Sequence, residues 1–325
     1  PISCLDGATG NVIRVYDQTK GAEEIIMRNG TLFALVNKDA DRLNKEFAVK
    51  QQSDQKRVET EFNWDGKPRE LFAIEAESGK TLWKQEDRIA PFTMAIDDKR
   101  VVYYNGDGIA ARDAKTGEVK FTTDPTKRRQ LYEFNFAPRI LLHNDVIIYA
   151  GGDGAMKGMN AETGKDIWTA PHEKSGYRSL EDVIVAQGLV WNSGNMQGNQ
   201  SGEYRGFDPL TGEKKKSFFP DVPEGTYWFH HRCYMGKATE KYIIPSRTGI
   251  EYVDMEKQHW DLNHWVRGAC LYGVMPANGL TYAGPHNCAC YPEAKLDGMD
   301  VMASAPRYPM PANTPDDQRL VKGPA

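Results

Sequence analysis

Short hydrophobic runs alternate with small polar turns along most of the chain. In one stretch, residues 94–96, 101–104 and 109–112 are rich in β-branched, aromatic and other apolar side chains, and Asp, Asn, Gly and basic residues separate them. Residues 140–142 and 146–149 begin a second stretch of the same kind. Such runs, bounded by turn formers, predict antiparallel β-strands that are joined by hairpins.

A five-residue turn signature follows the hydrophobic runs of each unit. It reads Asp, Glu or Asn, then two variable residues, then Thr or Ser, then Gly, and it occupies residues 6–10, 75–79, 113–117, 160–164 and 208–212. The Gly supplies the positive φ of a tight turn, and the Asp or Thr side chain can hydrogen-bond to the local backbone. The last three intervals between these glycines are 38, 47 and 48 residues, which indicates an array of one supersecondary unit.

Four strands in each unit, arrayed radially, make a β-propeller, so the predicted fold is an all-β propeller of four-stranded blades. A large side chain after the signature is expected to pack between neighbouring blades, at Trp83, Phe121, Trp168 and Phe218. Residues 2–5 are already the strand before the first signature, so the chain is expected to hold six blades plus a partial one. We expect a seven- or eight-bladed ring, whose other blades come from the rest of the polypeptide or from another chain.

The signature fades in the last two copies. Residues 241–254 keep the hydrophobic runs, but no Thr-Gly follows Asp254, and residues 278–300 form a last copy. Because Asp208, Asp254 and Asp300 lie 46 residues apart, the period predicts that Asp300 takes the place of the signature's first residue.

One continuous repeat over residues 1–303 predicts a single propeller domain. Residues 37–70 interrupt it with an insertion that is strongly charged and poor in β-branched side chains. A charge run of this kind is typical of a solvated loop, and the alternative is a lid over the propeller face. Residues 304–325 contain several prolines and are expected to form an irregular tail or linker.

Composition narrows the classes of function. The 41 basic and 45 acidic residues give a net charge of −4, which argues against a nucleic-acid partner. No run approaches 18 apolar residues, so we expect no membrane span. Four of the five cysteines lie close together in the last blades, and this clustering favours a periplasmic or extracellular location, where disulfides persist.

The clustered cysteines, which have three interpretations, are Cys233, Cys270, Cys288 and Cys290. The first interpretation is disulfide bonds. Cys288 and Cys290 point the same way in a strand, so each needs a partner elsewhere, and Cys233 and Cys270 are the candidates. The second is a metal site that includes a histidine, although Cys-x-Cys lacks the usual ligand spacing, and the third is buried free thiols. Cys4 is expected to be an unpaired core residue.

Histidine, basic and tyrosine side chains gather in the same region. The candidates for binding or catalysis are His231, Arg232, Lys237, Arg267, Tyr272, His286, Tyr291 and Lys295. Their positive charge indicates an anion-binding funnel at the axial mouth, suited to a carboxylate or sulfate on a sugar or a cofactor, and the alternative is surface ion pairing. The tyrosines can stack on a sugar ring or act as acid and base groups.

The repeat resembles the PQQ-like, or quinoprotein alcohol dehydrogenase-like, propeller repeat over residues 1–303. Residues 227–303 also resemble a group of secreted bacterial PQQ-like propeller proteins, in which an Arg-Cys segment, a later Cys and a Cys-x-Cys recur in this order. The repeat implies a propeller fold but no single activity, because it serves PQQ-dependent alcohol dehydrogenases and also the non-catalytic lipoprotein of the bacterial outer-membrane assembly machinery.

The sequence argues against a PQQ redox centre. PQQ dehydrogenases resemble one another in an adjacent Cys-Cys pair and a calcium site of Glu and Asn with an Asp base, and this chain has no Cys-Cys and no Cys-x-x-Cys-His. No cofactor is therefore expected, and a divalent metal is left open. Three functions remain: binding a ligand or protein partner at the axial face, lyase or hydrolase action on anionic sugars, and quinoprotein oxidoreductase. Whether the chain is an enzyme stays open.

Overall fold

The computed structural model describes residues 1–39, 64–128, 138–173, 181–192, 202–221, 234–245, 249–263, 265–268, 273–285, 296 and 298–304. Within these residues the regular structure is β-strand, with one short 3₁₀ helix at Asp17–Thr19. The paired strands are antiparallel. The predicted all-β class is confirmed.

Strands that follow one another in the sequence pair with one another in space. They form five four-stranded sheets, one three-stranded sheet and one two-stranded sheet. In chain order the sheets are β1 (Ile2–Leu5) and β2 (Val12–Tyr16); β3 (Ala22–Arg28), β4 (Thr31–Val36), β5 (Arg69–Glu75) and β6 (Thr81–Asp87); β7 (Ala95–Ile96), β8 (Arg100–Tyr104), β9 (Ile109–Asp113) and β10 (Val119–Thr122); β11 (Arg139–His143), β12 (Val146–Ala150), β13 (Ala155–Asn160) and β14 (Asp166–Pro171); β15 (Val183–Ala186), β16 (Leu189–Asn192), β17 (Tyr204–Phe207) and β18 (Lys214–Phe218); β19 (Lys237–Ala238), β20 (Tyr242–Ile244), β21 (Tyr252–Asp254) and β22 (His259–Asp261); and β23 (Val274–Ala277), β24 (Leu280–Ala283) and β25 (Asp300–Ala303).

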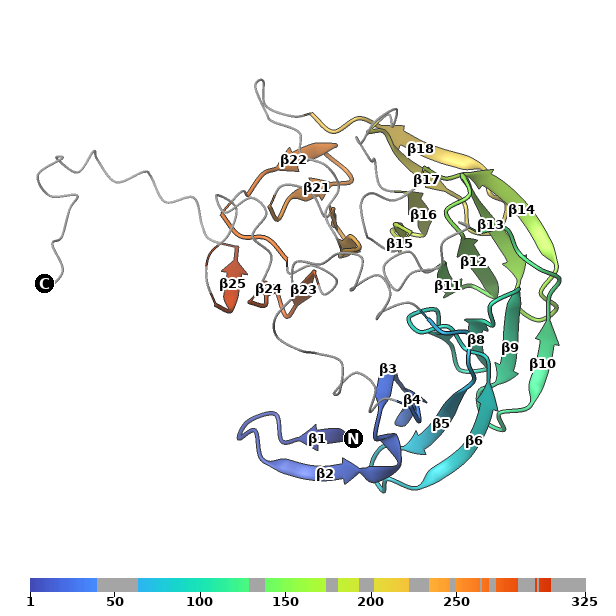
Figure 1. Cartoon of the computed structure of the whole chain (residues 1–325). Helices are drawn as coiled ribbons and strands as arrows, with labels where there is room; N and C mark the ends of the chain where they lie inside the picture. Colours follow the sequence, from blue (N-terminus) through green and yellow to red (C-terminus); the bar gives the residue numbers. More distant parts are fainter. Residues whose placement is uncertain are drawn as a thin grey trace, which may run out of the picture.

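The sheets follow one another around a common centre, each with its first strand inside and its last strand outside (Figure 1). The first strands β7, β11, β15, β19 and β23 each contact the next in this order. The sheets are therefore blades of a propeller, as predicted. β1–β2 is the outer half of a partial blade, and the sixth blade, β23–β25, has three strands within the described residues.

Each blade has two ends, which we name by what they carry. The turn end carries the hairpin between the first and second strands and the signature turn between the third and fourth. The entry end is where each first strand begins. The second strands β8 and β12 are buried along their whole length, because neighbouring blades cover both of their faces, which explains why these runs are the most apolar in the sequence.

The signature turn is held by its own first side chain. The Asp113 carboxylate accepts hydrogen bonds from the backbone N–H groups of Lys115 and Thr116, at 2.9 and 3.0 Å, and Gly117 closes the turn with a φ of 75°. The turn survives in the fifth full blade without Thr-Gly: Asp254 accepts equivalent bonds, and Gln258 adopts a φ of 56° in the place of the glycine.

The last copy differs from the prediction. β24 pairs with β25 so that Leu280 lies opposite Ala303, as Val146 lies opposite Asn160 in the blade of β11–β14. Ala303 therefore takes the place of the signature's first residue, and Asp300 begins β25 instead. The assignment of Asp300 to the first position of the signature was wrong, because the connection between β24 and β25 is longer than the period assumes.

Neighbouring blades are joined where a side chain on the fourth strand meets the signature turn of the next blade. Trp83 donates its indole N–H to the carbonyl of Ala114 at 2.9 Å, and Trp168 donates to Pro209 at 2.9 Å. The same rings leave no room for a side chain on the turn glycine: a Cβ on Gly212 would lie 2.6 Å from Trp168. The glycine thus provides both the left-handed turn and the surface on which the ring lies.

The four predicted aromatic side chains all pack between blades. Phe121 lies on Gly164 of the next turn, and Phe218 joins a buried cluster with Ile243 and Val253 of the next blade. The docking position itself, four residues after the glycine, is not always aromatic. Arg14 occupies it in the partial blade and bonds the Ser78 carbonyl at 2.8 Å, and Lys216 donates to the Met255 carbonyl.

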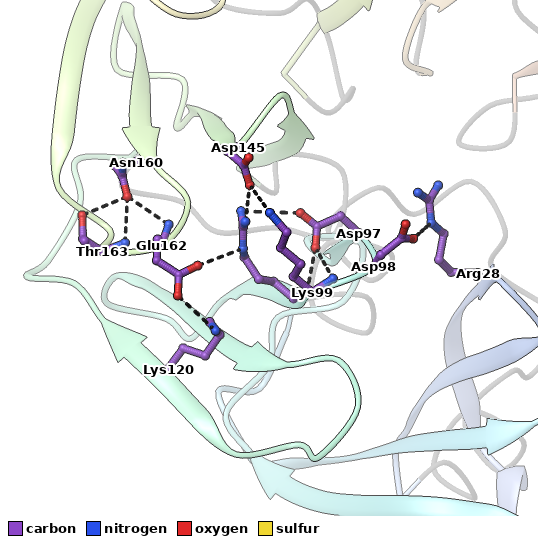
Figure 2. A network of polar contacts seen from close by, with 10 residues as sticks. Arg28, Asp97, Asp98, Lys99, Lys120, Asp145, Asn160, Glu162 and Thr163 are labelled. Atoms are coloured by element: carbon purple, nitrogen blue, oxygen red, sulfur yellow. Dashed lines mark hydrogen bonds and ion pairs between the residues drawn. The ribbon is translucent and has the colours of Figure 1, made fainter.

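Ion pairs add a second set of links at the turn end (Figure 2). Arg100, only 1% exposed, contacts Asp145 and Glu162 of the next blade, and Lys99 reaches the same Asp145 at 3.3 Å. Within its own blade, Arg100 also forms an ion pair with the Asp97 carboxylate, at 3.5 Å from guanidinium nitrogen to carboxylate oxygen. A buried guanidinium with several carboxylate neighbours is compensated, so this network is structural.

Substitution of Trp168 by alanine tests the docking contact. The change removes a buried ring and its hydrogen bond, so the free energy of unfolding should fall by about 3–5 kcal/mol, measured by urea denaturation. Trp265→Ala is the control, because Trp265 is 72% exposed and should change the free energy by about 0.5 kcal/mol or less. Equal effects of the two substitutions would contradict this role.

Candidate axial binding site

Charged side chains stand where the first strands begin. Arg139 is the first residue of β11, Lys237 is the first residue of β19, and Asp182 directly precedes β15. Glu24 lies near the start of β3. The first strands line the centre of the propeller (Figure 1), and these four residues stand at or near the ends where the first strands begin.

A cavity of about 260 Å³ lies against β11, β15 and β19. Arg139 and Lys237 both line it, and the other walls are mainly aliphatic, from Leu141, Val183 and Val185. This volume is just below the roughly 300–1,000 Å³ of pockets for drug-sized ligands. The cavity is therefore suited to a small charged group that has an apolar body.

The two cations of this cavity have no ion-pair partner among the described residues. Neither Arg139 nor Lys237 forms a salt bridge within the part of the chain that the structure describes, and the Arg139 Nε atom is buried there without a hydrogen-bond acceptor. Burial and the nearby Arg139 lower the pKa of Lys237, and Asp182 opposes this change. Burial also lowers the pKa of Arg139, against the attraction of Glu24 and Asp182. An anion placed between the two cations would relieve both penalties.

The Asp182 carboxylate, close to the two cations, already accepts a backbone hydrogen bond. Asp182 is 1% exposed, and its Oδ1 atom accepts the backbone N–H of Gly236 at 2.9 Å. This bond ties the start of β15 to the residue before Lys237. Asp182 therefore helps to position the cavity wall while its negative charge balances part of the two positive charges.

A buried histidine lies behind the same strand start. His172 Nδ1 is 3.7 Å from the Glu181 carboxylate, and both side chains are almost fully buried. The other ring nitrogen lies 3.4 Å from the Asp182 carbonyl. His172 does not line the cavity, and its contacts join the end of β14 to the segment that leads into β15.

Glu24 is another titratable group of this end whose pKa is shifted. Its carboxylate accepts the backbone N–H of Phe92 at 2.7 Å. Burial raises the pKa of Glu24 to about 8, against the lowering effects of that hydrogen bond and of Arg139. With this pKa the group is mostly protonated at neutral pH and only partly balances Arg139.

Of the sequence candidates, Lys237 lies in the cavity, whereas Arg267 is buried at 4% exposure and does not line it. The others lie outside the described residues: His231, Arg232, Tyr272, His286, Tyr291, Lys295 and the cysteines Cys233, Cys270, Cys288 and Cys290. The strands that flank these positions in the sequence have their nearer ends at the entry end.

The sequence analysis missed Arg139, Glu24, Asp182 and the buried pair of His172 and Glu181. The useful signal was a charged residue at or just before the start of the first hydrophobic run in several repeats. Among the described residues no cluster of three His, Cys, Asp or Glu side chains could hold a metal ion, and no helix is long and apolar enough to span a bilayer. Cys4 has a free thiol and packs against the core, as predicted.

The pH dependence of stability tests the environment of Glu24. A carboxyl group whose folded-state pKa is raised keeps its proton longer in the folded chain, so stability should fall as pH rises from about 4.5 to about 8. In Glu24→Gln the side chain stays neutral, so the variant should gain stability relative to the wild type across this range. Thermal melts at several pH values measure the difference. Glu77→Gln, at an exposed turn position, is the control, and parallel curves for all three proteins would contradict the raised pKa.

A thiol titration of the denatured, unreduced chain tests the predicted disulfides. We expect one reactive thiol, that of Cys4, because the other four cysteines should be paired. Five reactive thiols would show that the disulfide prediction is wrong. Four thiols that react only after a chelator is added would favour the metal interpretation.

Comparisons with known proteins agree with this fold. Residues 64–193 match the family described as outer membrane protein assembly factor BamB. No curated protein matches the chain significantly. Three solved structures are similar to it. The computationally designed Ika8 protein has 12% sequence identity and a TM-score of 0.55, and the match covers 86% of this chain and 73% of that one. BamB from Moraxella catarrhalis has 13% identity and a TM-score of 0.45, with 66% of this chain and 60% of that one covered, and quinohemoprotein alcohol dehydrogenase from Comamonas testosteroni has 12% identity and a TM-score of 0.46, with 82% and 48% covered.

At these identities, likeness in structure speaks for the fold and not for an activity. The chain spans 60% of the length of the solved BamB structure that it matches. The recurring turn signature, the radial array of antiparallel sheets and the matched family segment point to the same repeat. The chain is a β-propeller, and its repeat resembles the PQQ-like repeat of the matched family model.

Proposed function

We propose that the chain is a binding propeller that takes an anionic group at its entry end and carries no PQQ redox centre. The observation that supports this function is the pair of Arg139 and Lys237, which share one cavity and have no salt bridge within the described residues. Two half-buried cations with only partial compensation favour an anion, because part of their charge is withdrawn from water without a matching negative group.

The shape of the cavity limits the ligand. A guanidinium can hold a carboxylate or sulfate through two parallel hydrogen bonds, and a lysine ammonium adds a point charge. The aliphatic walls from Leu141 and Val185 suit the apolar face of a sugar ring or a short carbon chain. We therefore favour a small carboxylate or sulfate ester, such as an acidic sugar, as the ligand class.

Binding is favoured over the two catalytic alternatives. Hydrolase or lyase chemistry needs a positioned acid and base, and Lys237 is the one readily titratable side chain among the described lining residues. A PQQ centre of the dehydrogenase type would need an adjacent cysteine pair, and the sequence contains none. The described cavity, with two cations and aliphatic walls, does not fit that arrangement either.

We also propose a protein partner and a location. The match to an outer-membrane assembly factor favours protein binding and a periplasmic or extracellular location. Apolar side chains are exposed at both ends of the array, at Val15 and Met27 on one side and at Met275 and Val301 on the other. Further propeller strands, from the rest of the polypeptide or from another chain, would cover these faces.

Calorimetric titration with sulfate and with glucuronate tests the binding function. We expect saturable binding of at least one of them, and Lys237→Met and Arg139→Met should each weaken it about tenfold or more. Lys115→Met, at an exposed turn position, should leave it unchanged. Circular dichroism checks that each variant is folded.

Two results would overturn the proposal. One is the absence of binding by the wild type, or binding that neither cavity variant weakens. The other is a quinone chromophore in the absorbance spectrum of the purified protein, which would indicate a redox centre.

A further inference from the structure

A carboxylate stands beside Arg139, at the same place on the neighbouring first strand. Asp182 lies four residues before the last residue of β15, and Arg139 lies four residues before the last residue of β11. In both blades a two-residue hairpin follows that last residue. Because β11 and β15 contact each other, this shared register places Asp182 and Arg139 side by side at the entry end.

Lys237 joins this pair from the next first strand. It is the first residue of β19 and directly follows Gly236, whose backbone N–H is bonded to the Asp182 Oδ1 atom at 2.9 Å. A Cβ on Gly236 would lie 3.1 and 3.2 Å from the two carboxylate oxygens, so the carboxylate lies close against the backbone there. Asp182, which is 1% exposed, is therefore held in place one residue from Lys237.

Arg139, Lys237 and Asp182 together carry a net charge of about +1 at the cavity, because the carboxylate offsets one of the two cations. The three charges act on one another: Asp182 opposes the lowering of the pKa of both Lys237 and Arg139. A ligand with one negative charge would make the group neutral, whereas a second negative charge would have no partner in it.

Two other carboxylates of this end are less closely tied to the cations. Glu24 occupies the same place on β3, four residues before the end of that strand, and its pKa of about 8 leaves it mostly protonated at neutral pH. Glu181 precedes Asp182, but its carboxylate lies 3.7 Å from His172 and is not among the groups that shift the pKa of either cation. Asp182 is therefore, among the described residues, the carboxylate that most directly sets the charge of the site.

We propose that Asp182 determines the charge specificity of the axial site, so that the site takes a ligand with a single negative charge, such as a carboxylate or a sulfate monoester, and discriminates against a doubly charged phosphate monoester. The cost of moving an ion out of water grows with the square of its charge, whereas its attraction to a site of fixed charge grows only in proportion. A second negative charge on the ligand therefore costs more than the net positive charge of the site returns. This inference rests on the proposed anion binding and adds the charge of the ligand to it.

Glucose 6-sulfate and glucose 6-phosphate are matched probes, because they share a sugar and differ in charge. The sulfate ester keeps one negative charge, and the phosphate ester passes from one to two near about pH 6. In calorimetric titrations of the wild type, the two esters should bind within about threefold of each other at about pH 5. At about pH 7 the phosphate ester should bind about tenfold more weakly, since only about one molecule in eleven is still singly charged.

Asp182→Asn tests the residue itself, because asparagine keeps an oxygen for the Gly236 N–H and removes the charge. With two net positive charges at the site, the variant should bind the two esters within about threefold of each other at about pH 7 as well. Glu77→Gln is the control: it removes one negative charge at an exposed turn position and should keep the wild-type difference. Circular dichroism checks that both variants are folded, and the pH series of the wild type needs no variant.

Two results would overturn this inference and leave anion binding intact. One is equal affinity of the wild type for the two esters at both pH values, and the other is a wild-type difference that persists unchanged in Asp182→Asn. Failure of both esters and of glucuronate to bind is a different result, because it would overturn the proposed function itself.

Discussion

The contact between a fourth-strand side chain and the signature turn of the next blade is the interaction on which the propeller depends. A single blade is buried on both faces at its second strand, so it is stable only between neighbours. The docking contact fixes where that neighbour lies. At Trp83 and Trp168 the contact combines a buried ring, a hydrogen bond from the indole N–H, and a turn glycine with a positive φ and no side chain to obstruct the ring. One five-residue turn thereby connects the third and fourth strands of its blade and also forms the surface on which the preceding blade docks.

Two arginines, the buried Arg100 and the half-buried Arg139, show how the ends of the propeller differ. Arg100, at the turn end, contacts three carboxylates from its own and the next blade, so its charge is compensated. Arg139, at the entry end, has no salt bridge among the described residues and a lysine beside it in the same cavity. The ion pairs of Arg100 join neighbouring blades, whereas Arg139 and Lys237 leave a net positive charge near the axis. That difference is why we assign binding to the entry end.

The fold could be predicted from the sequence because the turn signature and the apolar second strands recur with similar residues in successive blades. The sequence analysis missed positions where a different residue type makes the same contact or adopts the same backbone conformation. Gln258 takes the left-handed place of a glycine, and Lys216 docks in place of an aromatic ring. The axial charges were missed for another reason: Arg139 and Asp182 share a place at the start of a first strand but differ in residue type and charge, and the convergence of the first strands brings them together. The choice of residues 227–295 rested on rare residue types, and of its candidates Lys237 is the one placed in the cavity.

Anomalous diffraction from crystals grown in bromide measures the central claim most directly, because bromide reports the positions of anions without assuming a ligand. A strong anomalous peak between the Arg139 guanidinium and the Lys237 ammonium, absent from crystals of Lys237→Met, is the expected result. Peaks confined to exposed lysines, or a peak at the cavity that persists in Lys237→Met, would contradict an anion site made by this pair.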